Sequence, residues 1–411
     1  MDNPDPETFG PLAAIAPESL VLLASNIAKR CLNLPTTGGT LIARISGSYN
    51  ITHVIELGNA KFVIRVPATG WGAGLTQAAA DAMASQVATI RLIRSKTAIP
   101  VPEIYALDTS VANEIGAPYI CMSFIPGKPV SEVWFDYSGT LPRDEFRLRI
   151  LTSLSHTMAQ FSCFSFDQMG SIMESESNST VIGPSYDWDE QEDGSLHVTM
   201  SGPYDSTSAF LDRNPAEGPG ENASVWNKAA AKLSEVLLDC LPTLDSPSSF
   251  VLCFPDFDSQ NVLVDDEGTV TGLIDWDLAQ TMPRFVGYAR YPGWITRDWD
   301  PLMYGWPKLA DSEDSPETLE RYRAHYNREL GKAHKWQGDW KYTAKSHVFE
   351  AIWIAALHRL NRLEICRKFV RAVAGDDADA SDILYDIGAG LYEDEDWLTL
   401  KADLRRFICE E

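Results

Sequence analysis

The sequence predicts an α+β protein in which a small, strand-rich lobe is followed by a larger, mainly helical lobe. Short apolar runs bounded by turn residues fill the first part of the chain, and Pro126-Gly127 closes that part. Past Pro142 the apolar residues recur at helical spacing. A length of 411 residues suits two domains or one two-lobed unit, at about 150 residues per domain.

Charge and composition exclude several classes of protein. The chain carries 58 acidic and 34 basic residues, which gives a formal net charge of −24. Proteins that bind nucleic acid or anionic membranes need basic patches, so we expect neither as a partner. The longest uninterrupted apolar run, Ala351 to Leu357, is far shorter than the ~20 residues of a membrane-spanning helix.

Cysteine usage and the first residues of the chain indicate a reduced, cytoplasmic protein. The seven cysteines are scattered, odd in number and never spaced as C-x-x-C, which argues against a disulfide framework or a zinc site. The segment MDNPDPETFG is acidic and contains proline, unlike a secretory or transit peptide. The sequence does not indicate an oligomeric state.

The elements of the first lobe follow from apolar spacing and turn residues. Residues 1–40 predict a helical extension. In the lobe proper, residues 83–93 carry apolar side chains at helical spacing, and Pro100 and Pro102 end that helix. The helix of the extension is predicted at residues 17–31, and strands are predicted at residues 41–47, 50–57, 61–67, 103–108 and 118–124.

The second lobe is predicted to be mainly helical, with one strand-bearing segment near its centre. That segment, residues 250–280, holds short apolar strands around polar residues and a turn at Asp266-Glu267-Gly268. Residues 174–220 are rich in Ser, Gly, Asp and Pro, and so long an excursion is expected to contain structure of its own. Helices are predicted at residues 143–161, 225–241 and 346–373.

Three polar residues of the central segment form the strongest chemical signal. Asp256 and Asn261 are five residues apart after one apolar strand, and Asp275 ends another. A phosphoryl-transfer site needs a carboxylate that orients the nucleophile and accepts its proton, and oxygen ligands that hold Mg²⁺ against the phosphates. Asp and Asn supply the oxygen ligands that such a hard cation prefers. Two solvated turns would also contain Asp and Asn, and they are the alternative interpretation.

At these residues the chain resembles the aminoglycoside phosphotransferase and choline kinase group, which are small-molecule relatives of the protein kinases, and in particular a fungal phosphotransferase-like branch. The resemblance covers residues 40–370, and its carriers are KFVIRVP, AIPVPEIYALD, PYICMSFIPGKPV and PDFDSQNVLVDDEGTVTGLIDWD. It implies a two-lobed protein-kinase-like fold. The nucleotide-binding N-lobe would be residues 41–127, and the helical C-lobe would be residues 128–411 with its catalytic loop at 250–280.

The resemblance also implies roles for single residues. Asp256 matches the catalytic-loop aspartate, Asn261 the second metal ligand, and Asp275 the metal-binding aspartate of the following motif. Asp277 stands where a further acidic residue is common. ATP and Mg²⁺ are the implied cofactors. The implied nucleotide-binding positions are Arg65 on the phosphates with Gln86 beside it, Gly47 and Ser48 in the phosphate loop, and Met122 and Phe124 at the adenine edge.

The chain departs from the group at four places. Phe254-Pro255-Asp256 replaces the usual H-G-D, so a hydrogen bond that braces the catalytic loop is lost. Gln86 replaces the glutamate that pairs with the phosphate-anchoring residue, and a neutral amide can hydrogen-bond Arg65 but cannot form an ion pair with it. The phosphate loop contains a single glycine, Gly47. Arg65 also stands where the group has its phosphate-anchoring lysine, and its planar guanidinium can hold phosphate oxygens in place of that lysine.

Three functions remain open from the sequence. The first is a phosphotransferase that uses ATP and Mg²⁺ to phosphorylate a hydroxyl of a small-molecule acceptor. The second is a kinase-like protein that binds a nucleotide or another ligand with impaired turnover, or that performs other chemistry on this fold. The third is a phosphatase, because Asp256-Phe257-Asp258 resembles the D-x-D motif of haloacid-dehalogenase hydrolases, although Gln260 stands where that group has Thr or Val.

Aromatic and acidic residues that follow the motif are expected to serve packing and solubility. Trp294, Trp299 and Trp306 could line an acceptor pocket, but tryptophans more often pack a loop onto its lobe. Asp298 and Asp300 could contact a cationic acceptor, but in so acidic a chain we expect both to be solvated.

Overall fold

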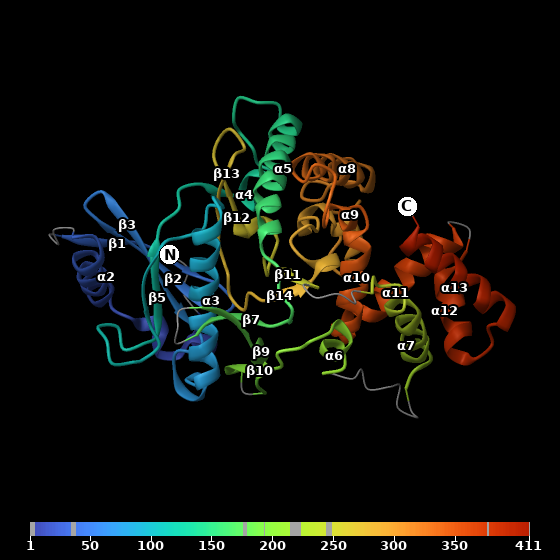
Figure 1. The fold of residues 1–411 in the computed structure, drawn as a ribbon, viewed down its shortest axis with the longest axis horizontal. Helices are drawn as coiled ribbons and strands as arrows, with labels where there is room; N and C mark the ends of the chain where they lie inside the picture. Colours follow the sequence, from blue (N-terminus) through green and yellow to red (C-terminus); the bar gives the residue numbers. More distant parts are fainter. Residues whose placement is uncertain are drawn as a thin grey trace.

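The computed structural model describes residues 5–33, 38–175, 179–192, 194–213, 223–243, 249–375 and 378–410. Within them the chain forms a strand-rich N-lobe and a mainly helical C-lobe, which lie on the left and right of Figure 1. The α+β class expected from the sequence is confirmed. The predicted extension at 1–40 and the excursion at 174–220 each lie partly outside the described residues.

The N-lobe is built on a five-stranded antiparallel sheet with the order β1-β2-β3-β5-β4. Side chains alternate between its faces along each strand. On β3 (Ala60–Pro67), Phe62 and Ile64 join one apolar core, whereas Val63 and Arg65 lie on the opposite face. The other strands, all near predicted ones, are β1 (Gly39–Ser46), β2 (Asn50–Leu57), β4 (Ile104–Asp108) and β5 (Tyr119–Ser123).

Two helices cover the two faces of this sheet. The predicted extension helix is confirmed as α2 (Pro17–Leu32), and its Leu20 and Leu23 are buried in one core with Phe62. The extension is therefore part of the N-lobe core. On the other face lies α3 (Gln77–Lys96), which begins where the Thr76 hydroxyl accepts a hydrogen bond from the backbone of Ala79. The short helix α1 (Pro6–Phe9) precedes α2.

The described residues contain no single helix that is both long and apolar enough to cross a membrane. One pair of helical segments, Pro6–Ala14 and Pro17–Leu32, meets the length and composition requirements when taken together, with a bend of 69° between them.

The C-lobe has two apolar cores, one around the central strands and one among the last helices. The central strands are β6 (Lys128–Pro129), β11 (Phe250–Leu252), β12 (Val262–Val264), β13 (Val270–Leu273) and β14 (Thr281–Pro283). The helices are α4 (Val130–Val133), α5 (Arg143–Ala159), α7 (Val225–Leu238), α8 (Pro316–Ala333), α9 (Trp340–Thr343), α10 (Ser346–Leu357), α11 (Arg359–Ala374), α12 (Ala380–Ala389) and α13 (Asp394–Cys409).

The helical structure predicted at 346–373 is confirmed, but it is divided at His358 into α10 and α11. His358 between them has an extended backbone, with φ −116° and ψ 102°. The Arg362 guanidinium of α11 then donates to the carbonyl oxygens of Ala355 and Ala356, at 2.8 and 3.1 Å. Those carbonyls lie in the last turn of α10, where helical partners are missing, so the arginine stabilises the end of the helix.

The predicted excursion contains two β-hairpins and a short helix. The strands are β7 (Ser171–Glu174), β8 (Thr180–Gly183), β9 (Ser185–Glu190) and β10 (Leu196–Ser201), and the helix is α6 (Thr207–Leu211). Strands β7 and β10 pack against α3 of the N-lobe, while Ser171 forms a β-bridge with Gln280 of the C-lobe. These hairpins therefore contact both lobes.

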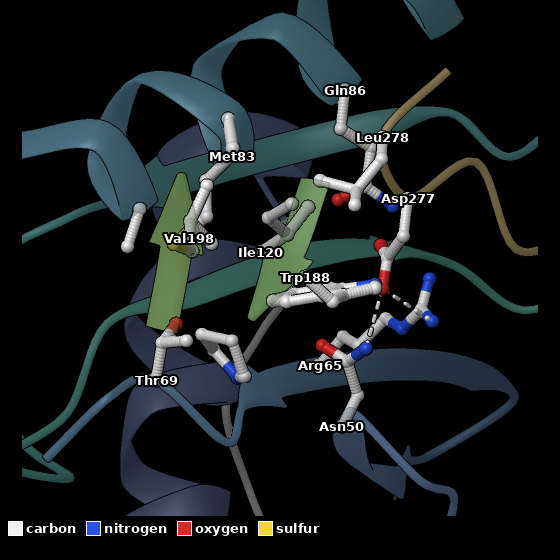
Figure 2. A pocket seen from close by; sticks show the side chains of 13 residues that line it. Asn50, Arg65, Thr69, Met83, Gln86, Ile120, Trp188, Val198, Asp277 and Leu278 are labelled. Carbon is white, nitrogen blue, oxygen red and sulfur yellow. Dashed lines mark hydrogen bonds and ion pairs between the residues drawn. The ribbon is translucent and has the colours of Figure 1, made fainter. Parts of the chain in front are cut away.

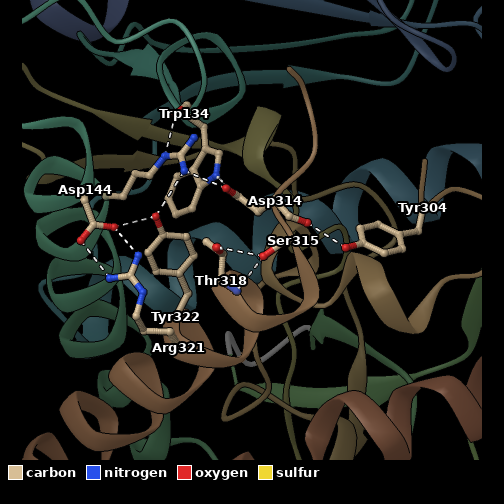
Figure 3. A network of polar contacts seen from close by, with 9 residues as sticks. Trp134, Asp144, Tyr304, Asp314, Ser315, Thr318, Arg321 and Tyr322 are labelled. Carbon is tan, nitrogen blue, oxygen red and sulfur yellow. Dashed lines mark hydrogen bonds and ion pairs between the residues drawn. The ribbon is translucent and has the colours of Figure 1, made fainter. Parts of the chain in front are cut away.

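A buried polar network ties the first helices of the C-lobe to the segment before α8 (Figure 3). Arg147 on α5 pairs with Asp314 at 2.8 Å and donates to the carbonyl oxygen of Trp134 at 2.8 Å. The Trp134 indole also donates to Asp314, at 2.7 Å. Because every charged group in this set has a close partner, the network can be buried without a large desolvation cost.

Candidate active site

A cavity of about 340 Å³ lies between the lobes. Val54 and Val63 line it from the N-lobe sheet, and Leu263 and Ile274 line it from the C-lobe. Residues 122–125, which lead out of β5, form one edge. Apolar walls beside an accessible backbone edge suit a flat aromatic ring that needs a few polar contacts for orientation.

Most of the predicted site residues line this cavity. They are Arg65, Gln86, Met122, Phe124, Asn261 and Asp275. Gly47 and Ser48 are not among the lining residues, although Ile45 on one side of their loop and Thr52 on the other are. Asp256 lies next to the cavity, because its carboxylate accepts a hydrogen bond from Asn261.

Asp256 is held by two amide side chains. Its Oδ2 accepts from Asn261 Nδ2 at 2.8 Å and from Gln260 Nε2 at 2.9 Å. Burial and then the nearby Asp258 raise the pKa of Asp256, while the two amides lower it. Since both bonds go to Oδ2, Oδ1 keeps its capacity to accept a proton. The sequence did not single out Gln260 for this contact, because an exposed glutamine in a loop carries no distinctive pattern.

The catalytic loop is braced although the usual histidine is missing. Phe254 is fully buried, and its ring packs on Trp276 and Phe257 with centroid distances of 4.7 and 5.7 Å. Arg290 Nη2 donates to the carbonyl oxygens of Phe254 and Pro255, at 2.9 and 3.2 Å. Phe254 cannot make the hydrogen bond of a histidine side chain, as expected, but Arg290 supplies two others to the backbone of the same loop.

Arg290 is itself fixed by an ion pair with Glu350 of α10. Its side chain is largely buried, and its guanidinium also lies over the ring of Phe257 at 5.9 Å. Sequence reasoning missed Arg290, because it lies 36 and 35 residues after the two residues whose carbonyl oxygens it contacts and belongs to no recognised motif.

Arg65 contacts two carboxylates below the N-lobe sheet. Its Nη2 lies 2.7 Å from Asp275 Oδ1 and 3.1 Å from Asp277 Oδ2. Asn50 of β2 donates to the same Asp277 oxygen at 2.5 Å, as the dashed lines of Figure 2 show. Burial raises the pKa of Asp277 to about 6, with a further rise from Asp275, whereas Arg65, Asn50 and Gln86 lower it.

The segment that follows β13 places the carboxylates of Asp275 and Asp277 against Arg65. β13 ends at Leu273, so Asp275 lies two residues beyond the strand that was predicted to end with it. Asp275 has φ 64° and Leu278 has φ 52°, which is the left-handed region that non-glycine residues seldom adopt. Strained backbone of this kind concentrates at functional sites, where the surrounding contacts hold it.

A second cavity, of about 120 Å³, shares no lining residue with the first. Asp258 lines it from that loop, and Arg297, Trp299 and Asp300 line it from the following segment. Glu350 lines it from α10. Residues of the loop that carries Asp256 thus line two separate cavities.

The expectations for the tryptophans and aspartates after the motif are met in part. Trp294 packs on Trp134 and Phe257, as expected for a packing role, whereas Trp299 also lines the second cavity. The expectation that Asp298 is solvated is wrong. It is buried and accepts from both terminal nitrogens of Arg323, at 2.6 and 3.1 Å.

Comparison with known proteins places these features in context. The profile of the phosphotransferase enzyme family matches residues 42–336, which confirms the resemblance found in the sequence. A subtelomeric hrmA-associated cluster protein of Aspergillus fumigatus is 24% identical over 339 residues, covering 66% of this chain and 64% of that protein. Altered inheritance of mitochondria protein 9 of Candida tropicalis is 30% identical over 156 residues, covering 38% of this chain and 23% of that protein. The chain thus spans less than two thirds of the length of these curated relatives.

Solved structures show a more distant likeness. The crystal structure of aminoglycoside phosphotransferase APH(4)-Ia has a TM-score of 0.45 and 17% identity, covering 89% of this chain and 98% of that one. Macrolide 2'-phosphotransferase type I has a TM-score of 0.44 and 12% identity, covering 92% of this chain and 99% of that one.

Proposed function

The chain belongs to the phosphotransferase enzyme family, and from that premise we propose that it transfers the γ-phosphoryl group of ATP, with Mg²⁺, to a hydroxyl of a small-molecule acceptor. One observation carries the proposal. Asn261 and Asp275 line the cavity between the lobes together with Arg65, and Asp256 is hydrogen-bonded to Asn261 beside it. We also propose a cytoplasmic protein, in keeping with seven free cysteines.

The residues of the cavity fit both cofactors. Asn261 commits its Nδ2 to Asp256, at 2.8 Å from the carboxylate and 3.0 Å from the carbonyl oxygen, so its Oδ1 is left for a cation. Together with the carboxylate of Asp275 this gives two oxygen donors of the kind that Mg²⁺ prefers. Arg65 offers a guanidinium for phosphate oxygens, and the apolar walls suit adenine. When bound, Mg²⁺ would neutralise charge on the phosphates.

The chain's own residues would then orient the acceptor and move one proton. Asp256 would accept a hydrogen bond from the acceptor hydroxyl at Oδ1 and take its proton as the oxygen attacks. A raised pKa makes this carboxylate a better proton acceptor than an ordinary aspartate. Arg290 and Phe254 would hold the loop so that Oδ1 of Asp256 stays in position. Accurate positioning of this oxygen would contribute to the rate.

The second cavity is the place that we propose for the acceptor. It is lined by Asp258, two residues from Asp256, and it shares no lining residue with the cavity proposed for the nucleotide. Charged and polar side chains line it together with Trp299, Ala351 and Ile354, which suits a molecule with both hydrophilic and apolar parts. The D-x-D phosphatase hypothesis is set aside, because the family match covers the whole of that motif.

Calorimetric titration of ATP into the protein, with and without Mg²⁺, tests the proposal alongside Asp275→Asn. We expect binding that needs the metal and that is lost in the variant. Asp266→Asn is the matched control. That carboxylate lies between Asn261 and Asp275 in the sequence, but it is exposed and does not line the cavity. An absence of ATP binding with and without Mg²⁺ would overturn the proposal.

A screen of hydroxyl-bearing acceptors for ADP release then separates an enzyme from a binding protein. Release of ADP that is lost in Asp256→Asn supports phosphoryl transfer. Metal-dependent ATP binding without acceptor-dependent ADP release would favour the kinase-like binding protein with impaired turnover.

A further inference from the structure

We propose that Asp277 is the fixed counter-ion of Arg65 and takes over the role that the resemblance assigns to a glutamate at position 86. In this arrangement Asp275 is the exchangeable partner, free to leave Arg65 for a metal ion. Asp277 is thus a positioning residue, which holds the guanidinium where phosphate oxygens would meet it. The kinetic consequences rest on the proposed function, but the ion pair does not.

The exposure of the two carboxylates separates their roles. Both contact the same Arg65 nitrogen, but the Asp275 side chain is 39% exposed and the Asp277 side chain only 15%. Water and a cation can reach Asp275, so it can exchange partners at modest cost. A buried carboxylate that lost its cation would remain as an unpaired charge, which is strongly unfavourable. Asp277 is therefore the partner that stays.

Asp277 also has a second anchor, which Asp275 lacks among the contacts seen in the described residues. Asn50 donates to the Asp277 oxygen that faces Arg65, so β2, β3 and the segment after β13 meet at one atom. Figure 2 shows this junction, with Asn50 and Arg65 converging on Asp277 and Gln86 above it. A carboxylate held from two directions fixes the guanidinium more tightly than one held from a single side.

The helix that would carry the glutamate does not need an ion pair to hold its position. Gln86 is buried, and within the described part of the chain its Nε2 has no partner at hydrogen-bond distance, although the amide is close enough to Asp277 to lower the pKa of that carboxylate. The hairpins of the excursion pack on the helix instead, with Ala79 and Ala82 of α3 in one core with Tyr186 and Val198. Packing has replaced the ion pair in placing α3, and this leaves Asp277 to pair with Arg65.

Trp188, from the excursion at residues 174–220, also lies beside the contact of Asn50, Arg65 and Asp277. Trp188 of β9 stacks on Tyr49 of the phosphate loop, with a centroid distance of 4.7 Å and an interplanar angle of 7°. The indole lines the same small cavity as Arg65 and Asp277. An aromatic wall there limits access of water to the ion pair, and a charge pair interacts more strongly where water is excluded.

Urea unfolding provides a test that does not depend on a nucleotide. Two double-mutant cycles compare Arg65→Met with Asp277→Asn and Arg65→Met with Asp275→Asn. We expect the coupling of Arg65 to Asp277 to exceed its coupling to Asp275 by about twofold or more. Equal couplings, or a stronger coupling to Asp275, would overturn the proposal.

The second test moves the carboxylate from position 277 to position 86 on α3. It does not use Arg65→Met, so it remains available if that variant fails to fold. In Asp277→Asn, Arg65 keeps Asp275, so we expect roughly 10- to 100-fold more Mg²⁺ to be needed for half-maximal ATP binding. Gln86→Glu in the same background should recover most of that loss, because it supplies a new carboxylate near Arg65. No recovery in a folded double variant would contradict the proposed role, since a merely structural defect is not repaired by relocating a charge.

Asp314→Asn is the matched control, because it removes a buried carboxylate from the Arg147 pair away from both cavities (Figure 3). It should lower stability without changing the Mg²⁺ requirement. A wild-type protein that binds no ATP would end the proposed function, whereas the unfolding cycles would still decide whether Asp277 is the counter-ion.

Discussion

The guanidinium of Arg290 donates a hydrogen bond of 2.9 Å to the carbonyl oxygen of Phe254, two residues before Asp256. This contact explains how an apolar ring can occupy a position where the family usually has histidine. The ring contributes packing on Trp276, and the arginine contributes the polar brace from outside the loop. Packing by Phe254 and hydrogen bonds from Arg290 thus hold the loop together.

Arg290→Ala is expected to destabilise the protein by about 3–5 kcal/mol, because it leaves Glu350 and two loop carbonyls without their partner. Urea unfolding measures the change. Arg406→Ala is the control, since its solvent-accessible pair with Asp403 should contribute less than about 1 kcal/mol. A similar small loss for both variants would show that Arg290 does not brace the loop.

Asp256→Asn is expected to lower kcat by roughly 10²- to 10⁴-fold, because an amide cannot accept the proton of the acceptor hydroxyl. ATP affinity should stay close to that of the wild type, since Asp256 is not among the residues that line the nucleotide cavity. Initial rates of ADP release and calorimetry measure the two quantities. Unchanged turnover would remove Asp256 from the mechanism.

Asp258→Asn is expected to move the acidic limb of the kcat/KM profile to lower pH. The negative charge of Asp258 raises the pKa of Asp256, so its removal lets Asp256 ionise in more acidic solution. Asp300→Asn is the control, because Asp300 lines the same acceptor cavity but is not among the charges that shift Asp256. If both variants moved the limb equally, the charge of Asp258 would not be its cause.

The buried Asp277 predicts a specific dependence of stability on pH. Its pKa is raised to about 6 in the folded protein, against an ordinary aspartate value of about 3.9, so between these pH values the folded state binds more protons than the unfolded state. The free energy of unfolding therefore falls as the pH rises from about 4 to about 6. Burial is the main cause of the raised pKa, Asp275 adds to the rise, and Arg65, Asn50 and Gln86 oppose it.

Asp277→Asn should abolish that part of the pH dependence. The difference in unfolding free energy between wild type and variant should decline from about pH 4 to about pH 6 and stay constant above about pH 7. Urea unfolding at a series of pH values measures it, and titrations shared by both proteins cancel in the difference. A difference that rises over this interval would contradict the raised pKa.

Much of the fold could be predicted from the sequence because its signals are local. Apolar runs bounded by turn residues predicted the strands β2 and β3, and prolines marked the end of α3. The break at His358 was missed, because the apolar periodicity continues across it and the arginine that stabilises the helix end acts from the next helix.

The candidate site was predictable only where its residues lie close together in the sequence. Asp256, Asn261 and Asp275 fall within twenty residues and form a pattern that the structure brings to one place. Asp277 as partner of Arg65 was not predictable, because that contact joins residues 212 positions apart. The same holds for Arg290, whose contacts with the loop depend on the packing of α10.

The hairpins at residues 171–201 change how the cleft can open. They contact α3 in the N-lobe and Gln280 in the C-lobe, so the lobes are connected through them as well as through the segment near residue 127. Rotation of one lobe about a single hinge near residue 127 would break the contacts of the hairpins either with α3 or with Gln280. Opening of the cleft would therefore require the hairpins to move with one lobe or to slide between both, so these contacts favour a shear motion over simple hinge bending.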